Sequence, residues 1–111
     1  MKVSAKKQLL KVLNDKKALS KKFGELAKPL MIRLSTLRAA PTLAHVPTAK
    51  PERLHQLSQD RDEQFAVDIK GQSRLIFVPD HDPIPRNADG GINKNEVTAI
   101  CITEVNTQHY K

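Results

Sequence analysis

Large apolar residues recur at intervals of three or four through residues 19–37. This spacing places their side chains on one face of an α-helix, so the segment is predicted to form a single amphipathic helix. The stripe continues in phase across Pro29, where we expect a kink rather than the end of the helix. The apolar face requires a second apolar surface to cover it. The stripe consists of Leu19, Phe23, Leu26, Leu30, Leu34 and Leu37.

A shorter helix is predicted before this one, because three leucines within residues 9–13 share one helical face. Asn14 can end it, and Asp15 can cap the helix that follows. The Ala40-Pro41 step stops the long helix. Further prolines then indicate an irregular crossing that leads to the second half of the chain.

The second half of the chain reads as strands. Apolar and polar residues alternate over residues 64–69, the pattern of a strand with one buried face. Residues 73–78 and 97–105 are apolar on both faces, which is typical of interior strands. Lys70-Gly71 supplies a turn between the first two strands. The prolines and glycines of residues 80–96 predict a long loop before the last strand.

The order of these elements indicates the fold class. Helices come first and strands afterwards, which predicts an α+β fold with N-terminal helices packed on a small antiparallel β-sheet. Residues 2–5 are a weaker candidate for an additional edge strand. With 111 residues, of which 39% are hydrophobic, we expect one domain over residues 1–111 with a single core.

The charge of the chain favours an anionic partner. Its formal net charge is +7 and its pI is about 9.8, so polyanions are attracted at long range and binding is expected to depend on salt. The alternative is a merely soluble, charged surface. Several lysines flank the apolar stripe and fit a solvated face, with support of a polyanion as the second interpretation. They are Lys16, Lys17, Lys21, Lys22 and Lys28.

Cysteine usage and hydropathy bear on the compartment. Cys101 is the only cysteine, which excludes an intramolecular disulfide and fits a reducing compartment. Its apolar surroundings predict a small core residue. The apolar runs are too short for a membrane span, and no hydrophobic stretch follows the basic N-terminus. We therefore expect a cytoplasmic protein without membrane association.

Four cationic or titratable residues lie at predicted strand ends, where they can converge: His55, Arg61, Arg74 and His109. Metal-independent RNA cleavage needs a base for the ribose 2′-hydroxyl, an acid for the leaving oxygen, and cations for the charge on phosphorus. Two histidines can exchange the protons, and arginines can hold the phosphate oxygens. The residue types therefore suit a phosphate-bearing substrate such as RNA.

Each of these residues also has a plainer interpretation. A lone histidine is most often a surface or packing residue, and Arg74 can be a strand-end charge paired with Asp68 or Asp80. The Asp80-His81-Asp82 run resembles part of a metal-binding loop, but the prolines that follow do not fit a calcium-binding loop. We therefore predict neither a metal nor a cofactor.

Three segments resemble the HigB-like toxins of the RelE/ParE toxin superfamily. Residues 54–65, LHQLSQDRDEQF, resemble the segment LHPLKGDRKGQW of those toxins. Residues 71–77, GQSRLIF, resemble their strand GQWRICF, and residues 104–109, EVNTQH, resemble their terminal EIVDYH. The loop over residues 82–91 resembles a subgroup often labelled plasmid-maintenance killer or killer-suppression proteins. The resemblance extends over residues 7–109, with the motifs in the order and spacing of the family.

The resemblance implies the toxin of a type II toxin-antitoxin system. Such a toxin is a ribosome-dependent endoribonuclease, an mRNA interferase that cleaves mRNA and inhibits translation. Its expected partners are a cognate helix-turn-helix antitoxin, in a toxin-antitoxin hetero-oligomer, and mRNA on the ribosome. By position, His55 and His109 match the two functional histidines, and Arg61 and Arg74 match arginines of the phosphate-binding surface. The resemblance thus implies catalytic roles for His55, Arg74 and His109.

The chain departs from the family pattern at two places. Ser58 stands where the family has a lysine, and Thr107-Gln108 stands where it has Asp-Tyr. Tyr110 is the candidate replacement for the missing phenol, and Lys50 or Arg53 for the missing cation. These three residues join Arg61 as predicted RNA-binding or phosphate-binding residues.

These departures leave three hypotheses. The first is an active mRNA interferase. The second is a catalytically degenerate protein that acts by binding the antitoxin or another protein target. The third is a gyrase-directed relative, which needs no nuclease residues. RNA cleavage in a translating extract separates the first from the other two.

Overall fold

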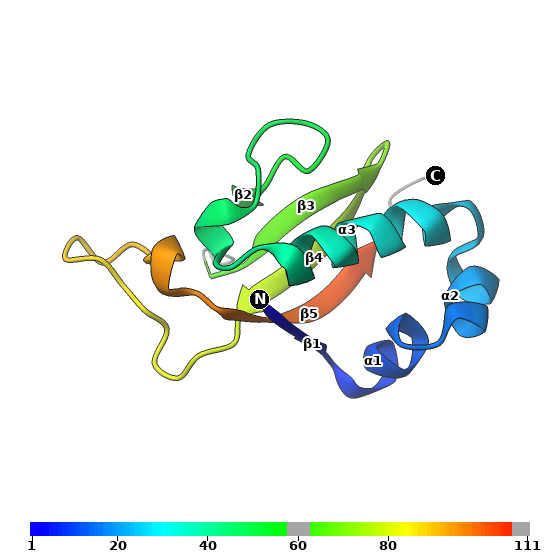
Figure 1. Ribbon diagram of the computed structural model, residues 1–111, viewed down its shortest axis with the longest axis horizontal. Helices are drawn as coiled ribbons and strands as arrows, with labels where there is room; N and C mark the ends of the chain where they lie inside the picture. Colours follow the sequence, from blue (N-terminus) through cyan, green and yellow to red (C-terminus); the bar gives the residue numbers. More distant parts are fainter. Residues whose placement is uncertain (58–62, 108–111) are drawn as a thin grey trace.

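The computed structural model describes residues 1–57 and 63–107. Five strands form one sheet in the order β1-β5-β4-β3-β2, and helices cover one face of it (Figure 1). This arrangement confirms the α+β fold and places β3, β4 and β5 inside the sheet. The strands are β1 Lys2–Ala5, β2 His55–Gln56, β3 Phe65–Lys70, β4 Ser73–Pro79 and β5 Ala99–Asn106.

The sheet is mixed rather than entirely antiparallel. β2, β3, β4 and β5 pair antiparallel, but β1 pairs parallel with β5. A parallel pair needs a long crossover connection, and here all the helices and three strands lie between the two partners in the chain. The edge strand expected over residues 2–5 is confirmed, and it contributes the parallel pair.

The helical layer consists of two short helices, a longer one and a 3-10 turn: α1 Lys7–Leu13, α2 Lys16–Phe23, η1 Gly24–Leu26 and α3 Ala27–Ala39. Asp15 caps α2 as expected, because its carboxylate accepts hydrogen bonds from the amides of Lys17 and Ala18 at 3.0 and 3.3 Å. Across residues 1–57 and 63–107, no helix combines the length and apolar character that a membrane span requires.

The prediction of one helix kinked at Pro29 is wrong. The chain leaves the helical conformation at Gly24, whose φ of 53° lies in the left-handed region that glycine adopts without strain. After the 3-10 turn, Pro29 is the third residue of α3. The first turn of a helix has no internal acceptors for its amide groups, so a residue without an N–H is tolerated there. The apolar stripe nevertheless stays in phase across the break.

The core lies between α3 and the inner face of the sheet. Leu30, Leu34 and Leu37 of α3 are buried there, and the rings of Phe65 and Phe77 stack at a centroid distance of 6.1 Å. Two further 3-10 turns, η2 Leu43–His45 and η4 Lys94–Glu96, close the end of the core near the long loop. That loop projects from the body of the molecule (Figure 1).

Cys101 does not belong to this core. It lies in β5 with Val78 as its register partner, is half-buried, and forms no disulfide. The neighbouring Ile100 and Ile102 are fully buried on the helical side. Side chains alternate along a strand, which places Cys101 on the opposite face and corrects its expected place in the core.

Candidate active site on the outer face of the sheet

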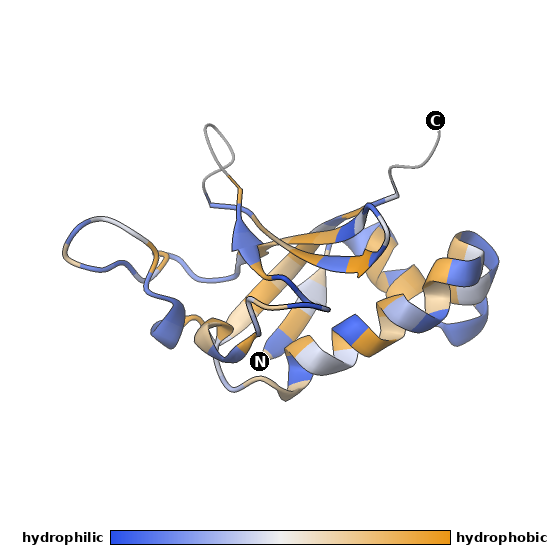
Figure 2. Ribbon diagram, turned by 90° about the horizontal axis from the view of Figure 1, so that it is seen from above, coloured by the Kyte–Doolittle hydropathy of each residue, from blue (hydrophilic) through white to orange (hydrophobic). Residues whose placement is uncertain are grey.

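The face of the sheet opposite the helices, here called the outer face, carries the candidate site. Phe65 and Val67 of β3 point into the core, so Asp68 of the same strand lies on the outer face. Arg74 is the register partner of Asp68, and His55 is the register partner of Ala66. Seen from above, the helices lie along the side of the sheet opposite the outer face (Figure 2). The topology therefore brings His55 and Arg74 to one face.

His55 and Arg74 do not touch each other. They belong to β2 and β4, with β3 between them, and their register positions differ by two residues along β3. Standard strand spacing then separates their Cα atoms by roughly 12 Å. This distance leaves room for a phosphodiester group between the imidazole and the guanidinium.

The tautomer of His55 follows from its hydrogen bond. Its Nδ1 lies 2.8 Å from the carbonyl oxygen of Arg53, and a carbonyl oxygen only accepts hydrogen bonds. Nδ1 therefore carries the proton, so Nε2 of the neutral ring has the free lone pair. The side chain is half-buried. A held imidazole with a free Nε2 is suited to accept a proton from a substrate.

Arg53 connects the two parts of the site. It has a φ of 47°, a left-handed conformation that costs a non-glycine residue roughly 1–2 kcal/mol. Its amide donates to the Ala49 carbonyl at 2.9 Å, and its Nε donates to Oδ2 of Asp68 at 2.6 Å. These contacts offset the strain and orient the carbonyl that holds His55.

Two polar depressions meet at Arg53. One of about 340 Å³ is lined by Arg53, Asp68, Gly71, Gln72 and Arg74. The other, of about 190 Å³, is lined by Thr48, Arg53, Leu54 and His55. The structure therefore brings three sequence-predicted residues, His55, Arg53 and Arg74, to one continuous polar surface.

The alternative ion pairs considered for Arg74 are not formed. The Asp68 carboxylate pairs with Arg53, and the Asp80 carboxylate accepts a hydrogen bond from the Ser4 hydroxyl at 3.3 Å. Within residues 1–57 and 63–107, the guanidinium of Arg74 forms no ion pair or side-chain hydrogen bond. Its donors are therefore available to an anion in the larger depression.

Arg33, which sequence reasoning missed, supports the site from behind. It is only 9% exposed on α3, and its Nε and Nη2 donate to the carbonyls of Asp68 and Ile69 at 2.6 and 3.5 Å. The register of β3 against β4 shifts between Asp68 and Lys70, so the ladder is irregular there. Arg33 supplies donors to this bulge and fixes the backbone that presents the Asp68 carboxylate. The sequence did contain a signal for a buried role of this arginine, namely its position among the buried leucines of α3.

We expect Arg33→Met to destabilise the protein by about 2 kcal/mol, because two carbonyls at the bulge lose their donor. Methionine keeps most of the aliphatic stem, so the loss reports mainly on the hydrogen bonds. Urea unfolding measures the change. Arg38→Met on the exposed side of the same helix is the matched control and should change stability by less than about 0.5 kcal/mol. Equal effects of the two substitutions would contradict this role.

The remaining predicted residues are placed only in part. Lys50 is exposed in the turn that precedes Arg53. Arg61, His109 and Tyr110 lie outside the described residues, as do Ser58 and Gln108. Their roles stay predictions.

Some chain neighbours of the unplaced residues have defined contacts. The amide of Leu57 donates to the Gln64 carbonyl at 2.8 Å, which joins the two sides of the segment that contains Arg61. Arg86 of the long loop also pairs with Glu63 at 2.6 Å. At the other end of the sheet, Asn106 is the register partner of Arg74 and precedes His109 by three residues.

The two other histidines have structural partners. Nε2 of His81 accepts a hydrogen bond from the Thr98 amide at 3.1 Å, and Nδ1 of His45 lies 2.8 Å from the Thr42 hydroxyl. Among residues 1–57 and 63–107, no group of three or more His, Cys, Asp or Glu side chains is arranged to hold a metal ion.

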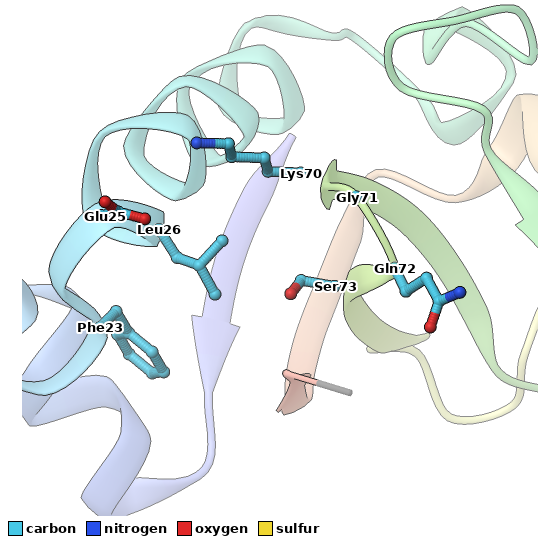
Figure 3. A pocket seen from close by; sticks show the side chains of 7 residues that line it. All are labelled: Phe23, Glu25, Leu26, Lys70, Gly71, Gln72 and Ser73. Atoms are coloured by element: carbon cyan, nitrogen blue, oxygen red, sulfur yellow. The ribbon is translucent and has the colours of Figure 1, made fainter. Parts of the chain in front are cut away.

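A larger depression of about 490 Å³ lies between the helical break and the β3–β4 turn. Phe23 and Leu26 extend from the helical side toward Ser73 of β4 (Figure 3). Its ionisable residues are Glu25 and Lys70, without a histidine or arginine. Among the described residues, this depression is therefore lined by no histidine or arginine, whereas the two smaller depressions that share Arg53 are lined by both residue types.

Comparison with known proteins supports the fold. No model of a known protein family matches the chain, and no curated protein matches it significantly. A solved structure that matches is the YoeB/ParE toxin from Agrobacterium tumefaciens, with 11% sequence identity, 99% of this chain and 100% of that chain covered, and a TM-score of 0.54. The likeness covers both chains almost completely and shows that this protein shares the fold of that toxin.

Proposed function

We propose that this protein is the toxin of a type II toxin-antitoxin system, of the HigB-like subgroup, and that it cleaves mRNA on the ribosome without a metal. The observation that carries the proposal is the polar surface on the outer face. It combines an imidazole whose Nε2 carries the free lone pair, on His55, with the guanidinium of Arg74, which has no ion-pair partner among the described residues. The imidazole can accept a proton and the guanidinium can stabilise negative charge, and both lie on a fold similar to that of a YoeB/ParE toxin.

In the proposed reaction, Nε2 of His55 removes the proton of a ribose 2′-hydroxyl, and the oxygen attacks the adjacent phosphorus. The bond from phosphorus to the 5′-oxygen breaks, and His109 protonates that oxygen. The products are a 2′,3′-cyclic phosphate and a 5′-hydroxyl end. Arg74 holds a non-bridging oxygen as negative charge accumulates. Arg53 contributes through its terminal nitrogens, since its Nε is bound to Asp68.

The other predicted residues complete the proposal. Arg61, Lys50 and Tyr110 bind the RNA backbone on either side of the reacting phosphate. A helix-turn-helix antitoxin neutralises the toxin in a hetero-oligomer by covering this polar surface, and the site of action is the cytoplasm, where mRNA is translated.

Two assays test the function. A message added to a translating extract should be cut in the presence of the protein, and the fragments should begin with a 5′-hydroxyl. In cells, expression should arrest growth, and co-expression of the adjacent reading frame should relieve the arrest. An extract in which the message stays intact while translation continues would contradict the nuclease.

A binding protein without catalysis is the second candidate. Asp68 lies between Arg53 and Arg74 and offsets part of their charge, and Ser58, Thr107 and Gln108 replace a lysine, an acid and a phenol of the family pattern. Such a protein acts on the antitoxin or on a target such as gyrase. It should arrest growth while messages remain intact, so the same two assays distinguish it from the nuclease.

A further inference from the structure

The net charge of this protein resides entirely in its first 28 residues. Residues 1–28 contain nine lysines and two acidic residues, Asp15 and Glu25. Residues 29–111 contain ten lysines and arginines and ten acidic residues, so they are formally neutral. The +7 charge therefore belongs to the segment of β1, α1, α2 and the start of α3, not to the segment that carries the candidate site.

Seven of these lysines form what we call the lysine surface, on α1, α2 and the residue before α1. All seven are exposed, and none has an ion-pair partner within residues 1–57 and 63–107. The two helices adjoin at one end of the molecule, beside α3 (Figure 1). The members are Lys6, Lys7, Lys11, Lys16, Lys17, Lys21 and Lys22.

Two of the four lysines of α2 point away from the core. Leu19 is buried on the inner side of this helix. With about 100° of rotation per residue, Lys17 and Lys21 lie nearly opposite Leu19, and Lys16 and Lys22 lie on the flanks. Gathering like charges on two short helices destabilises the folded state by repulsion. A polyanion bound across them removes that repulsion.

We propose that the lysine surface binds the phosphate backbone of double-stranded RNA, as a docking surface separate from the candidate active site. Lysine ammonium groups are compact charges that hold phosphates without demanding a particular geometry, so binding should not depend on sequence. The assignment of RNA as the partner of the lysine surface rests on the proposed function, because a ribosome presents mainly duplex RNA to a toxin that acts on it. Docking on the helical side then leaves the outer face free for the message.

Two other kinds of partner fit the lysine surface less well. Helices that lie on membranes place large apolar side chains toward the lipid, but the exposed large hydrophobic residue of residues 1–57 and 63–107 is Ile32, on α3. Protein interfaces are depleted of lysine and enriched in aromatic residues. The exposed positions of α1 and α2 carry neither aromatic nor large aliphatic side chains.

The test compares two double variants with the same net charge. K21Q/K22Q removes two charges from the lysine surface, and K70Q/K94Q removes two exposed lysines elsewhere. The probe is a mixed-sequence RNA duplex of about 16 base pairs, with affinity measured by fluorescence anisotropy between about 50 and 200 mM salt. K21Q/K22Q should weaken binding roughly tenfold and reduce the slope of log K against log salt by about two. K70Q/K94Q should change affinity less than about twofold.

The other outcomes distinguish a failure of the lysine surface from a failure of the proposed function. Equal losses in the two double variants would overturn the lysine surface. Tighter binding to phosphatidylserine vesicles or to polyglutamate than to the duplex would overturn RNA as its partner. Cleavage of a message in a translating extract is scored separately. A wild-type protein that binds the duplex through Lys21 and Lys22 but cuts no message contradicts the proposed function alone.

Discussion

His55→Gln is expected to lower mRNA cleavage by roughly two to four orders of magnitude, the usual contribution of a general base. Glutamine can donate from its amide to the Arg53 carbonyl, which now accepts from Nδ1 at 2.8 Å, but no nitrogen lone pair replaces Nε2. The rate of message cleavage in a translating extract measures the effect. Thermal unfolding should be nearly unchanged, because the side chain is half-buried at the short strand β2.

His45→Gln is the matched control for this substitution. His45 is exposed in η2 and lies 2.8 Å from the Thr42 hydroxyl, away from both polar depressions. The His45→Gln variant should cut messages at the parental rate. If His55→Gln also cuts at that rate, His55 is not the base, and the binding-protein function becomes the better account.

Arg74→Ala is expected to reduce cleavage by roughly a hundredfold, the scale for loss of one preorganised charge donor. Among residues 1–57 and 63–107 the guanidinium forms no ion pair, so its removal leaves no buried group without a partner. The melting temperature should therefore stay within a few degrees. Cleavage in the translating extract and a thermal melt measure the two effects together.

Two further arginine variants make the result interpretable. Arg74→Lys keeps the charge but loses the paired donors of the guanidinium, so activity should fall between the parent and the alanine variant. Arg38→Ala removes an exposed arginine from α3 and should leave cleavage unchanged. Loss of folded protein in Arg74→Ala, with the remaining fraction fully active, would make Arg74 a structural residue.

Periodicity predicted most of the fold because the buried positions follow it closely. The alternation predicted over residues 64–69 and the apolar runs that follow it correspond to β3, β4 and β5. The break at Gly24 was overlooked because the leucine stripe remains in phase through the 3-10 turn, so apolar spacing alone does not reveal it. A glycine near the end of a helical pattern was the available signal.

The candidate site was predictable only at the level of residue types. The sequence pattern placed His55 and Arg74 at the ends of strands. Whether the two residues share a face of the sheet depends on the register of three strands, which sequence spacing does not supply. The contribution of Arg33 depends on a bulge in β3 that leaves no mark in apolar periodicity. Arg53 was expected only as a candidate replacement for the missing cation of the family pattern. In the structure, its left-handed backbone and its ion pair with Asp68 make it the link between the two depressions.

The parallel pairing of β1 with β5 has a consequence for the time at which this protein becomes folded. β5 lies between β1 and β4 in the sheet, yet it follows both of them in the chain. During synthesis, β1 and β4 emerge without the strand that joins them, and contacts between such distant segments form late. The five-stranded sheet is therefore assembled only after residues 99–106 have been made. Until then, Arg74 does not lie on a complete sheet.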